Sequence, residues 1–233
     1  GNAWSATVSV ALADGVYDVT LKPTDAAGNT GTSVAEDALT IDTVKPTATI
    51  DRLITNDTTP TLTGTVTDPA PSGGIRRVMV RVGTQSFAAT VDGTTWSATV
   101  PRALQNGRYN VTVVTTDRAG NTSSKTVANI LTIDTRKPGV TVNRLVARTA
   151  TPVLTGTVTD GSPSSGIATV TVEVGGRTLT ATVNGRNWRA PVTSPLPDGT
   201  YDVVATATDR AGNVGKATRR GGLVVDTKAP VVE

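Results

Sequence analysis

Carboxylate and carboxamide oxygens recur in this chain within one short phrase. The sequence reads TDAAGN at residues 24–29, and TDRAGN at 116–121 and again at 208–213. These residue types allow two interpretations. Aspartate accepts local N–H bonds and glycine supplies a positive φ, so the phrase makes a good tight turn. Its oxygens are also the hard ligands that calcium takes from protein loops.

Composition excludes several other kinds of chemistry. The 233 residues include no cysteine and no histidine, which removes disulfides, thiol nucleophiles, zinc ribbons and Ser–His or Cys–His catalysis. The net charge is +3, basic residues are scattered singly and only 3% of residues are aromatic. We therefore expect no nucleic-acid partner. No stretch approaches the roughly 20 apolar residues of a membrane helix, so we expect no membrane insertion in this segment.

The phrase belongs to a repeat that extends over the whole chain. Tyr109 follows Tyr17 by 92 residues, and Tyr201 follows Tyr109 by the same number. The same spacing relates the three tryptophans, Trp4, Trp96 and Trp188. It also relates three aspartates that each end a strand-like run, Asp42, Asp134 and Asp226. A period without insertions indicates that each unit is one structural module. A module of this length suits a self-contained β-sandwich.

Proline gives the repeat its boundaries. Three strand-like runs each end with Asp-Thr, a short basic link and then proline, in LTIDTVKP, LTIDTRKP and LVVDTKAP. Strands break there because proline cannot donate to a strand ladder. We expect the C-terminal half of one repeat at 1–43, complete repeats at 44–135 and 136–227, and the start of another at 228–233. The half-repeat lacks a partner sheet and should not fold alone. We therefore expect this chain to be a piece of a longer one.

The elements that must position these residues are strands. Threonine and valine dominate the composition, and β-branched residues favour the pleated surface of a sheet. In the repeat at 44–135, we expect about seven strands with turns every 8–12 residues, which indicates a sandwich. The clearest of them are at 59–68, 75–82, the latter part of 104–117, and 126–134. The predicted fold class is all-β.

Three motifs in fixed order resemble a known family. LADGVY at 12–17, with LQNGRY and LPDGTY in the later repeats, is similar to the tyrosine corner of immunoglobulin-type domains. Together with TDxAGN and LTIDTxxP, it resembles the bacterial immunoglobulin-like repeats of giant surface adhesins. Val19, Val111 and Val203 occupy the position at which antibody domains carry a cysteine. The resemblance implies tandem Ig-like sandwiches whose sheets are held by packing alone.

The topology of such a sandwich predicts where the aspartates meet. The Asp after one repeat's last strand should approach two loops of the next repeat. This predicts one set made of Asp42, Asp68 and Asp117, and a second made of Asp134, Asp160 and Asp209. Asn121 and Asn213 are candidates to add a carboxamide oxygen. Such oxygens suit calcium better than Mg²⁺, which demands a near-ideal octahedron, and the resemblance also implies calcium at the junctions.

A metal-free interpretation stays open at this point. The phrase is a good turn without any ion. Basic residues nearby in the sequence would neutralise the carboxylates by forming ion pairs with them: Lys45, Arg118, Arg136, Lys137 and Arg210. The aromatic residues that recur in each repeat have structural interpretations. We expect Trp96 and Trp188 to pack in the cores, and Tyr109 and Tyr201 to donate the corner hydrogen bond.

These features predict a structural function rather than catalysis. We expect an extender region of a bacterial cell-surface or secreted adhesin, made of stacked modules that interdomain calcium stiffens. Its partners would be the neighbouring repeats and, through other regions, a host or biofilm-matrix target. The alternatives are a module that binds a carbohydrate or receptor, and a repeat of a self-associating extracellular filament. We expect no enzyme, because the aspartates recur in every repeat instead of lining one cleft.

Overall fold

The computed structural model of the protein describes residues 3–231. They form strands, turns and bends without helices, so this part of the chain contains no helix that is long and apolar enough to cross a membrane. The predicted all-β class is confirmed. The chain forms two compact units. Unit 1 comprises Gly1–Asp51, Thr61–Pro101 and Asn110–Ala128, and unit 2 comprises Arg52–Pro60, Arg102–Tyr109 and Asn129–Glu233.

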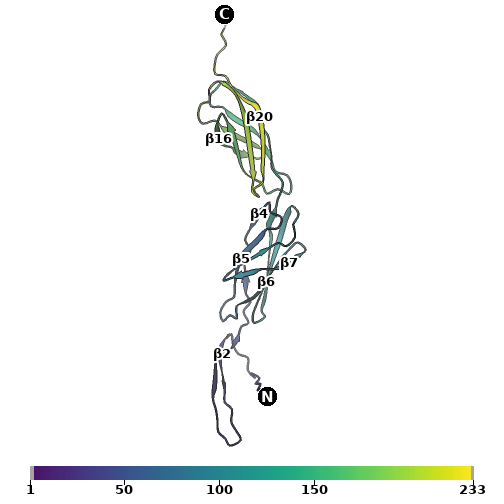
Figure 1. Ribbon diagram of the computed structural model, residues 1–233, viewed down its shortest axis with the longest axis vertical. Helices are drawn as coiled ribbons and strands as arrows, with labels where there is room; N and C mark the ends of the chain where they lie inside the picture. Colours follow the sequence, from purple (N-terminus) through teal and green to yellow (C-terminus); the bar gives the residue numbers. More distant parts are fainter. Residues whose placement is uncertain (1–2, 232–233) are drawn as a thin grey trace. The chain divides into compact units, whose positions relative to one another are not determined.

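Unit 2 contains a sandwich of two sheets. One sheet has the order β12 (Gly139–Val140), β14 (Val153–Thr159), β18 (Asn187–Pro191), β17 (Thr182–Asn184). The other has the order β13 (Leu145–Ala147), β20 (Val214–Val225), β19 (Gly199–Asp209), β15 (Ile167–Val174), β16 (Arg177–Thr180). β16 and β20 are labelled in Figure 1. Alternate residues of these strands point inward, and Leu154, Val172, Trp188 and Val203 are fully buried in one apolar core.

Residues 44–135 repeat this strand order. The four-stranded sheet is β3 (Thr47–Ala48), β5 (Thr61–Thr67), β9 (Thr95–Thr99), β8 (Thr90–Asp92). The five-stranded sheet is β4 (Leu53–Thr55), β11 (Thr122–Ile133), β10 (Gly107–Asp117), β6 (Ile75–Val82), β7 (Gln85–Ala88). Strands β10 and β11 contribute residues to both units. In unit 1, Val78, Val80, Trp96 and Val113 form the buried side of the strands.

Two segments of residues 44–135 are divided between the two sheets. At the start of the repeat, β3 pairs antiparallel with β5, and β4 pairs parallel with β11. The run after β6 splits at Ala89 into β7 and β8, which join different sheets. These short strands raise the number in residues 44–135 to nine. The expected strand at 75–82 coincides with β6.

Each buried tryptophan is fixed by a hydrogen bond that only a glycine permits. Trp188 Nε1 donates to the carbonyl of Thr141 at 2.9 Å, and Trp96 donates to Thr49 at the same distance. A Cβ at Gly156 would lie 2.0 Å from the Thr141 oxygen and 2.5 Å from the Trp188 ring. The predicted burial of both tryptophans is confirmed, since each is at most 1% exposed.

The tyrosine corner is present in all three copies. The hydroxyls of Tyr17, Tyr109 and Tyr201 donate to the carbonyl four residues earlier, at 2.9, 2.7 and 2.8 Å. In the N-terminal segment, β1 (Gly15–Leu21) and β2 (Ser33–Ile41) form a two-stranded sheet. β2 is labelled in Figure 1. Trp4 is 59% exposed there, in contrast to its buried counterparts.

Candidate metal sites

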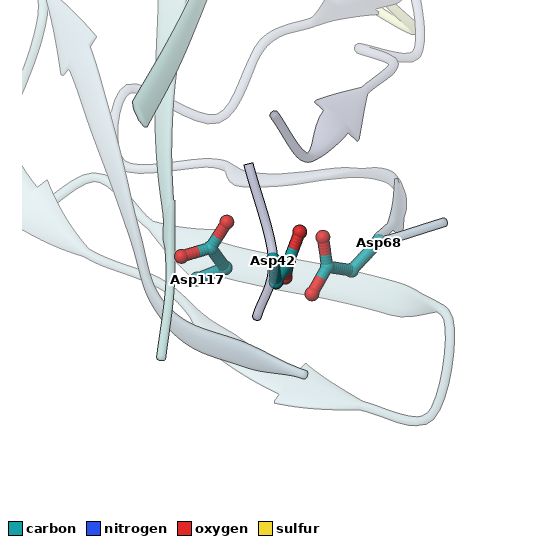
Figure 2. A group of neighbouring side chains, drawn as sticks. All are labelled: Asp42, Asp68 and Asp117. Carbon is teal, nitrogen blue, oxygen red and sulfur yellow. The ribbon is translucent and has the colours of Figure 1, made fainter. Parts of the chain in front are cut away.

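In unit 1, strand ends bring three carboxylates together. Asp42 follows β2, Asp68 follows β5 and Asp117 is the last residue of β10. One carboxylate oxygen from each lies within 4.8 Å of the others. Figure 2 shows Asp42 between Asp117 and Asp68. We call this group the first site. The sequence-predicted convergence of these three aspartates is therefore found.

One oxygen of each carboxylate in the first site serves the local backbone or loop. Asp117 Oδ1 accepts the N–H groups of Gly120 and Asn121 at 2.7 and 2.8 Å. Asp42 Oδ1 accepts the N–H of Val44 at 3.0 Å, and Asp68 Oδ2 accepts the hydroxyl of Ser72 at 2.5 Å. These bonds hold each carboxylate in place.

The other oxygen of each carboxylate in this site has no partner. Asp42 Oδ2, Asp68 Oδ1 and Asp117 Oδ2 are buried without a hydrogen bond. Asp117 is 0% exposed and Asp42 is 7% exposed. Burying an unpaired polar atom costs free energy, and more so for a charged group. Three such oxygens from three neighbouring carboxylates therefore form an arrangement that a positive charge would stabilise.

A divalent cation fits this arrangement. Calcium takes oxygen ligands at about 2.3–2.6 Å, so two ligands of one ion lie at most about 5 Å apart. The separation in the first site satisfies this limit. Three carboxylates leave room for carbonyl or water ligands in the six- to eightfold shell of calcium. The chemistry of this donor set is that of a hard, oxygen-liganded cation.

Unit 2 repeats the convergence with the second predicted set. Asp134 follows β11, Asp160 follows β14 and Asp209 ends β19, and one oxygen from each again lies within 4.8 Å of the others. We call this group the second site. Asp134 and Asp209 are buried, at 0% and 2% exposure. Both predicted sets of aspartates therefore meet in the structure.

The second site is closed by more hydrogen bonds than the first. Asp134 Oδ2 accepts the N–H of Ser165 at 2.8 Å, and Asp209 Oδ2 accepts the Asn213 side-chain amide at 2.8 Å. Of the three carboxylates, only Asp160 keeps a buried oxygen without a partner, its Oδ1. Its Oδ2 accepts Ser164 and the N–H of Gly166.

The first copy of the phrase shows that the turn needs no neighbouring repeat. Asp25 Oδ1 accepts the N–H groups of Ala27 and Asn29 at 2.9 and 2.8 Å, although the segment is exposed. The hydrogen bond from the Asn29 side chain, followed by that from its backbone, lowers the pKa of Asp25 below its ordinary value of 3.8. The turn and the candidate site are thus not alternatives in the first site, because Asp117 makes the turn with Oδ1 and keeps Oδ2 without a partner.

The side chains of Asn121 and Asn213 donate hydrogen bonds through their amide nitrogens. Asn121 Nδ2 donates to the carbonyl of Asp42 at 2.9 Å, and Asn213 Nδ2 donates to that of Asp134 at 2.7 Å. Each ties the TDRAGN turn to the chain that ends the previous repeat. The expected ligand role of their oxygens stays a prediction. Arg136, which the sequence offered as a counter-ion, uses Nη1 to donate to the Ser162 carbonyl.

The sequence prediction missed a hydrogen bond beside each junction. Asp14 accepts the N–H of Thr43 at 3.1 Å, and Asp198 accepts that of Thr227 at 3.0 Å. Asn106 Oδ1 accepts the N–H of Thr135 in the same way. The Thr227 hydroxyl, then its N–H, lowers the pKa of Asp198 below its ordinary value of 3.8. The 92-residue recurrence of both partners was the signal that could have revealed this pair.

One curated protein is similar to this chain in sequence. Chitinase A1 from Niallia circulans is 36% identical over 146 residues, which are 58% of this chain and 20% of that protein. The chain thus spans about one fifth of the length of this relative.

Two solved structures are also similar. The fibronectin(III)-like modules of Clostridium thermocellum CbhA cover 77% of this chain and 94% of theirs, at 16% identity and a TM-score of 0.48. A tetra-tandem repeat in the extending region of a large adhesion protein covers 93% of this chain and 58% of its own, at 28% identity and a TM-score of 0.37.

The decisive match is to a domain family. The bacterial Ig-like domain matches this sequence three times, at 1–43, 47–135 and 139–227. These matches follow the 92-residue period of the sequence and its tyrosine corners. The chain belongs to the bacterial Ig-like domain family and consists of these domains in tandem.

Proposed function

We propose that this chain is an extender region of a bacterial cell-surface or secreted adhesin, in which calcium joins each repeat to the next. The repeats are those with boundaries at 44–135 and 136–227. The observation that carries the calcium proposal is the first site, where each of three carboxylates has a buried oxygen without a partner and one oxygen of each lies within 4.8 Å of the others. A cation there supplies the missing positive charge.

The chain's own residues explain how one ion would stiffen a junction. Asp42 belongs to the segment that ends one repeat, whereas Asp68 and Asp117 belong to two loops of the next. The ion would therefore fix three segments by charge rather than by extensive apolar contact. It would also stabilise the folded state, because the unfolded chain does not assemble these ligands.

The family and the sequence support a non-catalytic role. The domains are alike along the whole chain, and within the described residues the clustered carboxylates lie at successive repeats rather than in one cleft. The partners in this proposal are the neighbouring repeats, with a host or biofilm-matrix target bound by other regions. The proposal includes no nucleic-acid partner and no membrane partner for this segment.

A second candidate function follows from the chitinase relative. Its 36% identity to this chain favours a module that binds a polysaccharide or spaces the parts of a secreted enzyme. A pull-down of the purified chain on insoluble chitin separates the candidates. Retention on chitin would favour the polysaccharide-binding module, and its absence would argue against that module.

Calcium titration tests the main proposal. Isothermal titration of the full chain with CaCl₂ should give binding, and the melting temperature should be higher in calcium than in EDTA. At 100 times its dissociation constant the ion contributes about 2.7 kcal/mol per site, which shifts melting by several degrees. MgCl₂ is the control and should have a smaller effect. Superimposable melting curves and no binding heat would exclude the calcium proposal.

A further inference from the structure

The two sites differ in how completely they close without a cation. The first site leaves three buried carboxylate oxygens without a partner, and the second leaves one. The sequence of the TDRAGN turn is the same in both sites. Its asparagine amide donates to Asp209 Oδ2 in the second site, whereas Asp117 Oδ2 in the first site has no partner. The loops that carry the middle aspartate do differ, since they read DPAPSGG at 68–74 and DGSPSSG at 160–166.

Ser165 connects two parts of the second site. Its N–H donates to Asp134 Oδ2 at 2.8 Å, and its hydroxyl accepts the N–H of Ala211 at 3.3 Å. Ser165 is 8% exposed. The side chain thus ties this loop to the TDRAGN turn and holds the backbone N–H against the Asp134 carboxylate.

Gly73 occupies the corresponding position in the first site, 92 residues earlier. It offers no hydroxyl to the turn, and Asp42 Oδ2, the counterpart of the oxygen that Ser165 engages, has no partner. A Cβ at Gly73 would meet the Cβ of Arg118 at 3.3 Å, a close contact that a shift of a few tenths of an ångström between these two loops relieves. A serine is therefore sterically acceptable at this position.

We infer that this loop position sets the cation affinity of each site. With Gly73, the first site binds the ion tightly, and with Ser165, the second site closes on hydrogen bonds and binds it more weakly. This inference rests on the proposed function. An ion entering the second site must displace the Ser165 N–H and the Asn213 amide from their carboxylates, whereas the first site presents oxygens that have no bond to lose.

The expected difference is measurable. Each displaced hydrogen bond has a modest net contribution to stability, so two of them weaken binding roughly 5- to 100-fold. The second site therefore empties first as calcium falls, and it remains closed through its own hydrogen bonds. The two junctions respond over different ranges of calcium concentration.

Single-site variants of the full chain assign an affinity to each site. Asp209→Asn leaves the first site intact, and Asp117→Asn leaves the second. In calorimetric titration with CaCl₂, Asp209→Asn should keep the tight binding event and Asp117→Asn the weak one. Amide NMR spectra of both variants in EDTA verify that they fold. Equal affinities, or the reverse order, would overturn the inference while leaving the proposed function in place.

Exchanging the loop residue tests its role directly. In the Asp117→Asn background, Ser165→Gly should strengthen binding at the second site roughly 2- to 12-fold, because it removes one of the two hydrogen bonds that the ion displaces. In the Asp209→Asn background, Gly73→Ser should weaken binding at the first site by a similar factor. Affinities that do not respond to either exchange would show that the loop residue has no such role. A wild-type chain without calcium binding at either site would overturn both this inference and the proposed function.

Discussion

The side-chain amide of Asn213 donates to the backbone carbonyl of Asp134, 79 residues earlier, at 2.7 Å. The same amide nitrogen donates to Asp209 Oδ2 at 2.8 Å. One side chain therefore completes its own turn and holds the segment that ends the preceding repeat. Asn121 makes the corresponding bond to Asp42, which makes this tie a general feature of the two junctions.

Replacing Asn213 with alanine should destabilise the chain even without metal. The change leaves the Asp134 carbonyl and one Asp209 oxygen short of a donor in a buried place, which costs about 1–3 kcal/mol. Urea unfolding in EDTA, followed by tryptophan fluorescence, measures the loss. Asn29→Ala is the matched control, because Asn29 is exposed and bonds within its own turn, and it should change stability by less than about 0.5 kcal/mol. Equal losses in both variants would contradict the tie.

The effect of Asp117→Asn on the melting temperature should have opposite signs without and with calcium. In EDTA the variant should melt higher than the wild type, because it removes a buried charge next to two other carboxylates and its amide can donate to them. In millimolar calcium it should melt lower, because a ligand is lost. Differential scanning calorimetry under the two conditions gives both numbers. Asp25→Asn, in the exposed copy of the turn, should show no such dependence on calcium. A variant that melts lower under both conditions would argue against unpaired charge at this position.

Gly156→Ala should be strongly destabilising. The added methyl group would lie 2.0 Å from the Thr141 carbonyl and 2.5 Å from the Trp188 ring, so either the strand or the tryptophan must move. Overpacking of this kind costs roughly 1–3 kcal/mol or more, and the loss of the Trp188 hydrogen bond adds to it. Denaturant unfolding measures the effect. At Gly161 the nearest atom to an added Cβ is 3.8 Å away, and Gly161→Ala serves as the near-neutral control.

Thr227→Val should raise the pKa of Asp198 toward its ordinary value of 3.8, because the Thr227 hydroxyl is the largest cause that lowers it. The folded-state pKa lies below the unfolded one. The bond therefore contributes its full stability above the unfolded pKa and loses it as pH falls through the folded value. An NMR titration of the Asp198 carboxyl group between about pH 2 and 6 covers this window. The Asp25 carboxyl should titrate identically in both proteins. An unchanged Asp198 pKa would show that the pair does not form in solution.

Much of this organisation is predictable from the sequence because it depends on period and pattern. The alternation of residues 75–82 predicts β6, and the 92-residue period groups the aspartates that the strand ends bring together. The parallel pairing of Leu53–Thr55 with β11 was not predictable. Three residues carry no signature of strand direction, and packing on the rest of the sandwich decides it.

The differences between the sites were also hidden in the sequence. Identical TDRAGN turns predict identical chemistry, yet a serine outside the motif engages one oxygen of Asp134. The expectation that the asparagines supply oxygen treated the carboxamide as a ligand alone. Its nitrogen turns out to hold a backbone carbonyl from the preceding repeat. Hydrogen bonds over such separations depend on tertiary structure, which local patterns do not encode.

The arrangement of aspartates around each junction has a consequence for how the number of repeats can change. Every 92-residue copy carries one aspartate at its end, as at Asp134 and Asp226, and two at its opposite pole, as at Asp160 and Asp209. An in-frame duplication of one copy would therefore also duplicate the aspartate at its end and the two at its opposite pole, which together supply both sides of a new junction. Recombination between copies can change the number of repeats in whole-module steps, and each added junction inherits its three aspartates without any further mutation.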